Sequence, residues 1–286
     1  MTDYYGYATL TLKNDFLSLD VLKDAGPRIV RLVPAGSGLN LLAEVPDMTW
    51  GIPGNLFHAF GGHRLWCAPE VEEITCLPDH TSCTVESIAN GLRLTREDHY
   101  AVSYRREIEI VLAPNAPKLT LTHRITNLGS EVFRAAPWAI TMFKLGGSKA
   151  RLPMSIEMIN GSPLTPNRSL VLWPYTDLKD ERLFVSGKYI EVKGEAADDA
   201  LKVGIYSTRG WAGIEFAEGW VVVKRVTVEP AASYTDMAAN IQCYVRHRFI
   251  EVETLGELKD LQPGESVSHV EEWELLKGSF DSLGLV

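Results

Sequence analysis

Chemically versatile side chains gather in one short stretch, His58 to Glu70, which reads HAFGGHRLWCAPE. It combines a Gly-Gly pair with two histidines, an arginine, a tryptophan and a glutamate, more than an ordinary turn needs. The glycines permit positive φ or a close approach of the backbone to a ligand. His63 could relay a proton, Arg64 could bind an oxygen through its planar fork, and Trp66 offers a flat apolar face. The stretch therefore predicts one wall of a ligand pocket.

Each of these residues also has a purely structural interpretation. Trp66 could belong to a hydrophobic core, and His58 and His63 could only satisfy backbone carbonyl groups. Arg64 could be the buried ion-pair partner of Glu70. These alternatives stay open for each residue, while the density of the cluster favours a functional role for the stretch as a whole.

A second candidate stretch, His247–Leu258, supplies carboxylates. Side chains alternate across a strand, so residues of equal parity share a face. If Ile250 and Val252 enter the core, the opposite face carries His247, Phe249, Glu251 and Glu253. Such a row could bind a polyhydroxyl ligand, and a positioned glutamate could act as a general base; the alternative is a solvated outer face. Arg246 and Arg248 would fall on the core side, which predicts a break in the strand there.

Composition and motifs exclude several classes of function. The net charge of −9 and the lack of a basic stripe argue against nucleic-acid binding. No HExxH pattern, GxSxG elbow, P-loop or dinucleotide fingerprint occurs, so we expect neither a metal site nor a cofactor. Apolar runs are far shorter than the roughly eighteen residues of a membrane span, and the N-terminal residues do not resemble a signal peptide. We therefore expect a cytoplasmic protein that does not enter a membrane.

The remaining histidines and the cysteines are interpreted as structural. Four histidines fall in or beside predicted strands without a visible partner: His80, His99, His123 and His269. The 4 cysteines form no CxxC pair and are too few for a disulfide scaffold in 286 residues. We expect free buried thiols at Cys67, Cys76, Cys83 and Cys243, although a bridge between Cys76 and Cys83 is geometrically possible and stays open.

Alternation of apolar and polar residues dominates the chain and predicts an all-β fold. The chain opens as a β-meander, continues with long alternating strands such as Val102–Leu112 and Lys118–Asn127, and contains no amphipathic helix longer than two turns. About sixteen strands are predicted, too many for one twisted sheet, so we expect two large antiparallel sheets packed face to face. We assign residues 1–286 to a single domain.

Three segments are expected to depart from regular strands. Glu44–Asn55 contains two prolines and two glycines and is predicted to be irregular. Pro137 interrupts an apolar strand and predicts an edge or a bulge just before Trp138. Prolines and glycines recur between Gly146 and Asp180, which predicts a long loop of the kind that forms lids or rims.

Three stretches of the sequence together resemble the aldose 1-epimerase (galactose mutarotase) superfamily: FGGHRLWCAPE, LTHRITNLGSEVFRAAPWAITMF and FIEVETLGELKDLQPGESVSHVEEWEL. The similarity is greatest to a bacterial branch with a GGHRLWPAPE-like signature, and it runs from the first strands almost to the end of the chain. It implies a large antiparallel β-supersandwich of the galactose mutarotase-like type. It also implies that a monosaccharide or sugar derivative binds in a groove on one sheet.

The resemblance further implies roles for individual residues. In that superfamily a glutamate takes the proton from the anomeric hydroxyl and a histidine protonates the ring oxygen, so that the ring opens, rotates and recloses. Matching ETLG to the E-T-x-G region of such enzymes places the base at Glu253, with Glu251 as second choice. The histidine of the H-T-Y-F-like stretch is replaced by Ile140. The acid role would then fall to His63 or His247, or the protein binds sugar without epimerising it.

Three hypotheses for function follow. The first is an aldose 1-epimerase-like isomerase acting on a free or modified sugar with Glu253 as base. The second is a catalytically silent carbohydrate-binding protein. In either case the substrate-binding residues would be Arg64, Trp66, Glu70 and Trp138, beside the two glutamates. The third is a structural β-sandwich that mediates oligomerisation. We expect a monosaccharide as partner, no nucleic acid, and a monomer or homodimer.

Overall fold

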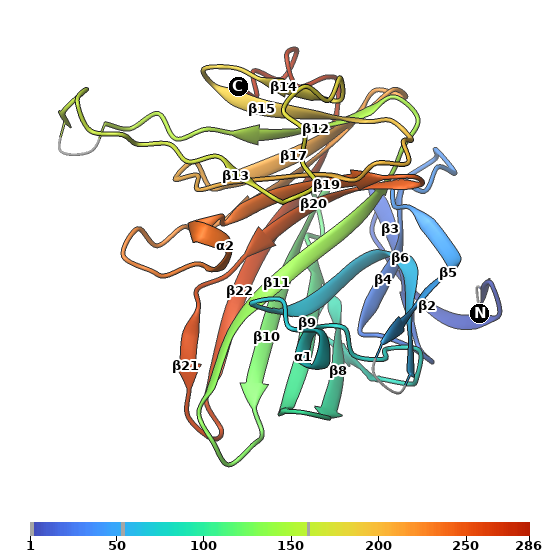
Figure 1. The fold of residues 1–286 in the computed structure, drawn as a ribbon. Coiled ribbons are helices and arrows are strands. Elements are labelled where there is room, and N and C mark those ends of the chain that lie inside the picture. The colour runs from blue at the N-terminus through green and yellow to red at the C-terminus, as the bar shows by residue number, and fades with distance from the viewer. Residues whose placement is uncertain (1–2, 53–54, 159–160) are drawn as a thin grey trace.

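The computed structural model describes residues 3–52, 55–158 and 161–286, and its backbone forms two large antiparallel sheets (Figure 1). The described residues include two short helical turns, α1 (Glu72–Thr75) and α2 (Thr235–Ala238). None of the helices described is long and apolar enough to cross a membrane. The prediction of an all-β fold with two antiparallel sheets is confirmed.

The larger sheet has 12 strands. Ten follow one another in space as β1 (Asp3–Tyr4), β2 (Tyr7–Lys13), β3 (Leu17–Leu22), β4 (Arg28–Pro34), β6 (Asn55–Ala68), β11 (Phe133–Lys144), β20 (Phe249–Leu255), β19 (Ile241–Arg246), β16 (Leu201–Ile205) and β13 (Val171–Leu172). Two more are attached to this path: β5 (Glu44–Ile52) pairs with β6, and β21 (Lys259–Leu261) pairs with β11. Strand β11 crosses the centre of the molecule between β6 and β20 (Figure 1).

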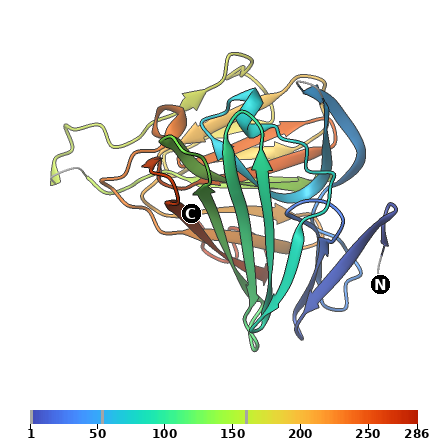
Figure 2. The same ribbon diagram turned by 90° about the horizontal axis from the view of Figure 1, so that it is seen from below.

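The smaller sheet has 10 strands. Their order is β14 (Leu183–Val185), β15 (Tyr189–Gly194), β12 (Ser148–Pro153), β17 (Trp211–Phe216), β18 (Trp220–Val226), β22 (Ser266–Lys277), β10 (Lys118–Asn127), β9 (Ser103–Leu112), β8 (Gly91–His99) and β7 (Thr84–Ile88). The long strands β8, β9 and β10 lie side by side in Figure 2. Strands β9 and β10 match the predicted strands Val102–Leu112 and Lys118–Asn127 to within one residue at each end.

The central strands of the larger sheet are buried on both faces. Leu65 of β6 and Val252 of β20 point into the main core between the two sheets. Trp66 and Phe249, which have the opposite parity, pack in a second apolar cluster on the other face. Because neighbouring residues of a strand face opposite sides, every residue here belongs either to the core or to this second face.

The segment Glu44–Asn55 corrects one sequence-based prediction. The prediction of irregular structure is wrong for β5, which pairs with β6 over most of its length. The register of this pair shifts between Val45 and Thr49. This bulge accommodates Pro46, because a proline nitrogen has no hydrogen to donate to a ladder. Pro53 and Gly54 lie outside the described residues.

Pro137 lies in the central strand β11, so the predicted edge is wrong, whereas the alternative of a bulge just before Trp138 is confirmed by a one-residue shift of register between Ala135 and Trp138. On one side, β21 pairs with β11 up to Ala135 and β20 takes over from Trp138. The Pro137 carbonyl oxygen accepts a hydrogen bond from the Gly256 backbone N–H on that same side. In an antiparallel strand the N and O of one residue face the same neighbour. The proline nitrogen therefore lies where the ladder is already interrupted.

The stretch from Gly146 to Asp180 is less irregular than the sequence suggests. It begins with β12, which is paired with both β15 and β17, and contains the short strand β13. The prediction of a long loop holds for the described residues between these strands; Ile159 and Asn160 lie outside them.

The four cysteines are free thiols. Cys76 and Cys83 are therefore not bridged, which settles the alternative that the sequence left open. Burial raises the pKa of the Cys67 thiol to about 12, so this thiol stays protonated and unreactive in the core.

The Gly61-Gly62 pair is required by backbone packing. Both residues have positive φ, +98° and +69°. A Cβ at Gly61 would lie 2.0 Å from the Ala43 carbonyl oxygen, and one at Gly62 would lie 1.9 Å from that of Ile29. The sequence correctly indicated a close backbone approach. The approaching group is the protein's own backbone and not a ligand.

We expect Gly62→Ala to destabilise the fold strongly, by more than about 3 kcal/mol, because the new methyl group overlaps a backbone atom that cannot move. Gly264→Ala is the matched control: Gly264 also has positive φ (+84°), but beyond its chain neighbours nothing lies within 4 Å of the place that the new methyl group would take. It should cost only about 1 kcal/mol of backbone strain. Urea unfolding measures both values, and equal losses would contradict a steric role for Gly62.

A polar cluster lies in the core between the two sheets. His123 Nδ1 lies 3.1 Å from the His269 carbonyl oxygen and donates to it, so His123 Nε2 accepts from His63 Nε2 at 2.7 Å. His63 Nδ1 then accepts from Thr141 Oγ1 at 2.9 Å. Lys224 Nζ donates to the same Thr141 oxygen at 3.0 Å. The hydrogen-bond directions are thus consistent with neutral imidazoles.

The same cluster contains the ligand-type atoms of His63, His123 and Glu271, all within 4.8 Å of one another. Lys224 Nζ lies 2.8 Å from Glu271 Oε1 and already supplies the positive charge that a metal ion would bring. Burial opposes ionisation of Glu271, but Lys224 outweighs it and holds the pKa of this carboxyl well below its usual range. We therefore interpret the cluster as a hydrogen-bonded structural core.

Acid should unfold the protein through this cluster. Burial lowers the pKa of His63 and His123, and that of His269 to about 3. Below about pH 6.5 these histidines bind protons in the unfolded chain but stay neutral in the folded protein. Their contribution to the free energy of unfolding is therefore fully present above that pH and decreases as the pH falls. Each histidine contributes at most about 1.4 kcal/mol per pH unit.

Urea unfolding at several pH values between 7.5 and 5.5 measures this effect. His99→Gln is the control, because the His99 side chain is 61% exposed and the variant should keep the same pH dependence. A free energy of unfolding that stays constant over this range would contradict the neutral state of the three buried histidines.

Candidate functional site

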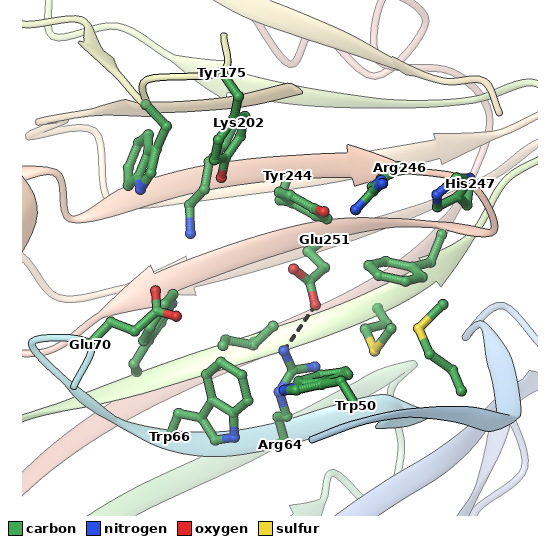
Figure 3. Close-up of a pocket in the computed structure, with 16 residues that line it drawn as sticks. Trp50, Arg64, Trp66, Glu70, Tyr175, Lys202, Tyr244, Arg246, His247 and Glu251 are labelled. Carbon is green, nitrogen blue, oxygen red and sulfur yellow. Dashed lines mark hydrogen bonds and ion pairs between the residues drawn. The ribbon is translucent and has the colours of Figure 1, made fainter. Parts of the chain in front are cut away.

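A pocket with a volume of about 410 Å³ lies on the second face of the larger sheet (Figure 3). Its floor carries same-face side chains of five adjacent strands: Arg64, Trp66, Trp138, Ile140, Met142, Phe249, Glu251, Tyr244, Arg246 and Lys202. Met48 and Trp50 of β5, Glu70, Trp173, Tyr175 and His247 complete the walls. This volume suits a small molecule that is largely enclosed by the protein.

An ion pair spans the middle of the pocket. Arg64 Nη2 lies 3.1 Å from Glu251 Oε1, and the two side chains are only 5% and 9% exposed (Figure 3). The Arg64 guanidinium also lies 4.2 Å from the centre of the Trp66 ring. Burial raises the pKa of Glu251 although Arg64 opposes this shift. Arg64 Nε and Nη1 are buried and have no hydrogen-bond partner among the described residues.

A second ion pair lies beside the first and deeper. Glu253 Oε2 accepts hydrogen bonds from Trp138 Nε1 at 2.8 Å and from Lys202 Nζ at 3.0 Å. Glu253 is fully buried, whereas Trp138 and Lys202 both line the pocket. The Lys202 ammonium lies 4.7 Å from the ring centres of Trp138 and Trp173. Of these two charged residues, Lys202 lines the pocket and Glu253 lies behind it.

Two predicted residues stand at the rim. Glu70 lines the pocket, and burial raises the pKa of its carboxyl. Its suggested pairing with Arg64 is not formed, because Arg64 pairs with Glu251. His247 also lines the pocket, but its side chain is 41% exposed and its Nδ1 lies 3.7 Å from Asp198. It lies at the turn between β19 and β20, where the sequence predicted a break.

His63 lies away from the pocket. It is fully buried in the core cluster with His123. The reason is strand parity: Arg64 follows His63 directly in β6, and adjacent side chains point to opposite faces. The structure therefore does not bring His63 together with Glu251 or Glu253. His58 packs beside His80, with 4.6 Å between the ring centres, and does not line the pocket either.

Sequence reasoning missed Lys202, Tyr244 and the two aromatic residues Trp173 and Tyr175. Lys202 and Tyr244 each lie between apolar neighbours in an alternating strand. This alternation could have shown that their side chains point away from the core. What the sequence did not reveal is that β19 and β16 follow β20 in the sheet. Trp173 and Tyr175 belong to the segment interpreted as loop, which forms a wall of the pocket as a rim loop would.

No protein-family model and no curated protein sequence matches the chain. Solved structures do. A candidate aldose 1-epimerase from Klebsiella pneumoniae aligns with a TM-score of 0.66 at 12% identity, over 100% of this chain and 84% of its own. One from Escherichia coli K12 aligns with a TM-score of 0.56 at 18% identity, over 95% of this chain and 100% of its own.

A galactose mutarotase-like protein from Lactobacillus casei aligns similarly, with a TM-score of 0.57 at 11% identity, over 94% of this chain and 100% of that one. The fold is the galactose mutarotase-like β-sandwich. At such low identity the likeness establishes the fold alone, so the function has to be argued from the pocket.

Removing one partner of the central ion pair should destabilise the protein. Arg64→Met leaves the Glu251 carboxylate buried without a counter-charge, and we expect a loss of about 3 kcal/mol. Adding Glu251→Gln to this variant should recover part of the lost stability, because a neutral amide costs less to bury than a carboxylate. Urea unfolding of the two single variants and the double variant measures the coupling.

Arg248→Met is the control for this cycle. It breaks the surface pair between Arg248 and Asp47, whose side chains are 44% and 69% exposed, and should cost less than about 1 kcal/mol. A double variant that is no more stable than Arg64→Met alone would contradict the assigned pairing.

Proposed function

We propose that the protein binds a monosaccharide or sugar derivative in the pocket and interconverts its anomers. The observation that carries this proposal is the row of charged groups set among tryptophans: Arg64 and Glu251 beside Trp66, and Lys202 between Trp138 and Trp173. A sugar ring presents apolar C–H faces and a belt of hydroxyls. Aromatic planes bind the faces, and charged side chains form strong hydrogen bonds with the hydroxyls.

Glu251 is our candidate for the base that accepts the proton of the anomeric hydroxyl. It lines the pocket directly, and burial raises the pKa of its carboxyl, which makes the carboxylate a stronger base. Glu253, which the sequence favours, reaches the pocket only through Trp138 and Lys202. Its second oxygen is buried and accepts no hydrogen bond from the described residues. Glu253 is kept as the alternative base because the resemblance of ETLG points to it.

A catalytically silent sugar-binding protein is the second candidate. One observation favours it: among the described residues, the one histidine that lines the pocket is the half-exposed His247 at its rim. A general acid contributes about 10²- to 10⁴-fold to rate, so its loss would leave binding without useful catalysis.

We also propose a cytoplasmic location for the protein and a single domain that works as a monomer or homodimer. Four free thiols in the described structure support a reducing compartment. One main core that contains residues from both ends of the chain, such as Leu17 and Leu275, supports the single domain.

Polarimetry of freshly dissolved α-hexoses and α-pentoses tests the proposal. We expect the wild type to accelerate mutarotation of at least one sugar, and Glu251→Gln to lower kcat by about 10²- to 10⁴-fold. The kcat of Glu253→Gln, compared with that of Glu251→Gln, shows which of the two glutamates acts as the base. Glu272→Gln, an exposed residue of β22, is the matched control and should match the wild type.

Thermal unfolding with the same sugars distinguishes the hypotheses, because a ligand that binds only the folded protein raises Tm. A raised Tm without accelerated mutarotation would establish the silent binding protein. No change of Tm and of rate with any sugar would overturn both sugar hypotheses and favour the structural β-sandwich.

A further inference from the structure

Ring opening of a cyclic sugar needs two proton transfers. One group must take the proton of the anomeric hydroxyl, and another must give a proton to the ring oxygen as the C–O bond breaks. Glu251 meets the first need under the proposed function, on which the present inference rests. No buried histidine of the described chain lies in the pocket to protonate the ring oxygen. His63 lies in the core, and Ile140 lines the pocket at the position where the resemblance would place a histidine.

We infer that Lys202 gives this proton, and that Glu253 positions the Lys202 ammonium for the transfer. Lys202 comes from β16 and extends into the pocket from the side opposite Arg64 and Trp66 (Figure 3). Its side chain is only 7% exposed, so it is held inside the pocket and does not extend into solvent.

The free N–H groups of Lys202 are what make it a donor. An ammonium has three N–H bonds. One is directed at Glu253 Oε2, 3.0 Å away, and no other oxygen or nitrogen acceptor in the described part of the chain bonds this nitrogen. Trp138 and Trp173 flank it at 4.7 Å and confine it. Lys202 lines the pocket, so an N–H that is not bonded to Glu253 can turn toward a ligand there.

The arginine and the tyrosines of the pocket are poor proton donors, and Glu70 and His247 stand at its rim. Arg64 keeps its proton at all accessible pH values, so it can orient an oxygen but cannot protonate it. Burial raises the pKa of the phenols of Tyr175 and Tyr244, which weakens them as donors. Lys202 combines an exchangeable proton with a carboxylate that keeps its side chain in one position.

The step balances without any further reactant. The Glu251 carboxylate takes the proton of the anomeric O–H, and that oxygen forms a double bond to the anomeric carbon. The bond from this carbon to the ring oxygen breaks, its electron pair goes to the ring oxygen, and this oxygen takes a proton from Lys202. After the aldehyde rotates, the reverse transfers close the ring as the other anomer and restore both residues. Nothing is oxidised or reduced.

The alternative is that Lys202 only neutralises Glu253. Lys202→Arg and Lys202→Ala separate the two roles, with kcat and KM measured by polarimetry on the sugar that gives the largest rise in Tm. Arginine keeps the positive charge but holds its proton. We expect Lys202→Arg to retain KM within about tenfold and to lose about 10²-fold or more in kcat.

Lys202→Ala should lose a similar factor, and added methylamine or ethylamine should restore part of the rate, with an efficiency that follows the acidity of the amine. The double variant Lys202→Ala/Glu251→Gln in the same amine buffers gives the background, because free amines also promote mutarotation. Rescue of this kind is not expected of a residue that only stabilises the fold, and near-UV circular dichroism shows whether each variant is folded.

The outcomes distinguish this inference from the proposed function. A Lys202→Arg variant with wild-type kcat, or a folded Lys202→Ala variant that no amine rescues, would overturn the role of Lys202 while leaving anomer interconversion intact. A wild type that shows a sugar-dependent Tm but no acceleration would overturn catalysis and Lys202 together while leaving binding. A wild type with neither response would overturn the proposed function itself.

Discussion

Alternation in β11, in β20 and in the part of β6 that follows Gly62 is the constraint on which the molecule depends. These strands are buried on both faces, so each residue serves either the core between the sheets or the pocket. Two separate polar systems result. His63, His123, Lys224 and Glu271 satisfy one another inside the core, whereas Arg64, Glu251, Lys202 and Glu253 are arranged around the pocket.

Charge pairing is the second constraint on the pocket. Burying an ion without a partner costs several kcal/mol, so each of the two buried carboxylates on β20 has a cation from another strand. Arg64 and Lys202 approach them from opposite sides of the pocket (Figure 3). The two ion pairs therefore add no net charge to this part of the pocket.

The sequence allowed much of the fold to be predicted, because strand positions follow from local alternation. It predicted the strands around Lys118–Asn127 and the face shared by Glu251 and Glu253 correctly. Its errors arose at prolines. The segment around Pro46 was predicted to be irregular and an edge was one alternative at Pro137, but both residues lie in paired strands where a shift of register accommodates them. Both solutions depend on neighbours that a local pattern does not contain.

The sequence by itself determined parity within the strands that it predicts, such as the face shared by Glu251 and Glu253. It did not predict β6, so the separation of His63 and Arg64 came from the structure. Only the tertiary structure decided which strands lie next to one another. Arg64 and Glu251 are 187 residues apart in the chain, and Lys202 and Glu253 are 51 apart. Side-chain direction follows from local backbone geometry, whereas strand order results from the packing of the whole chain.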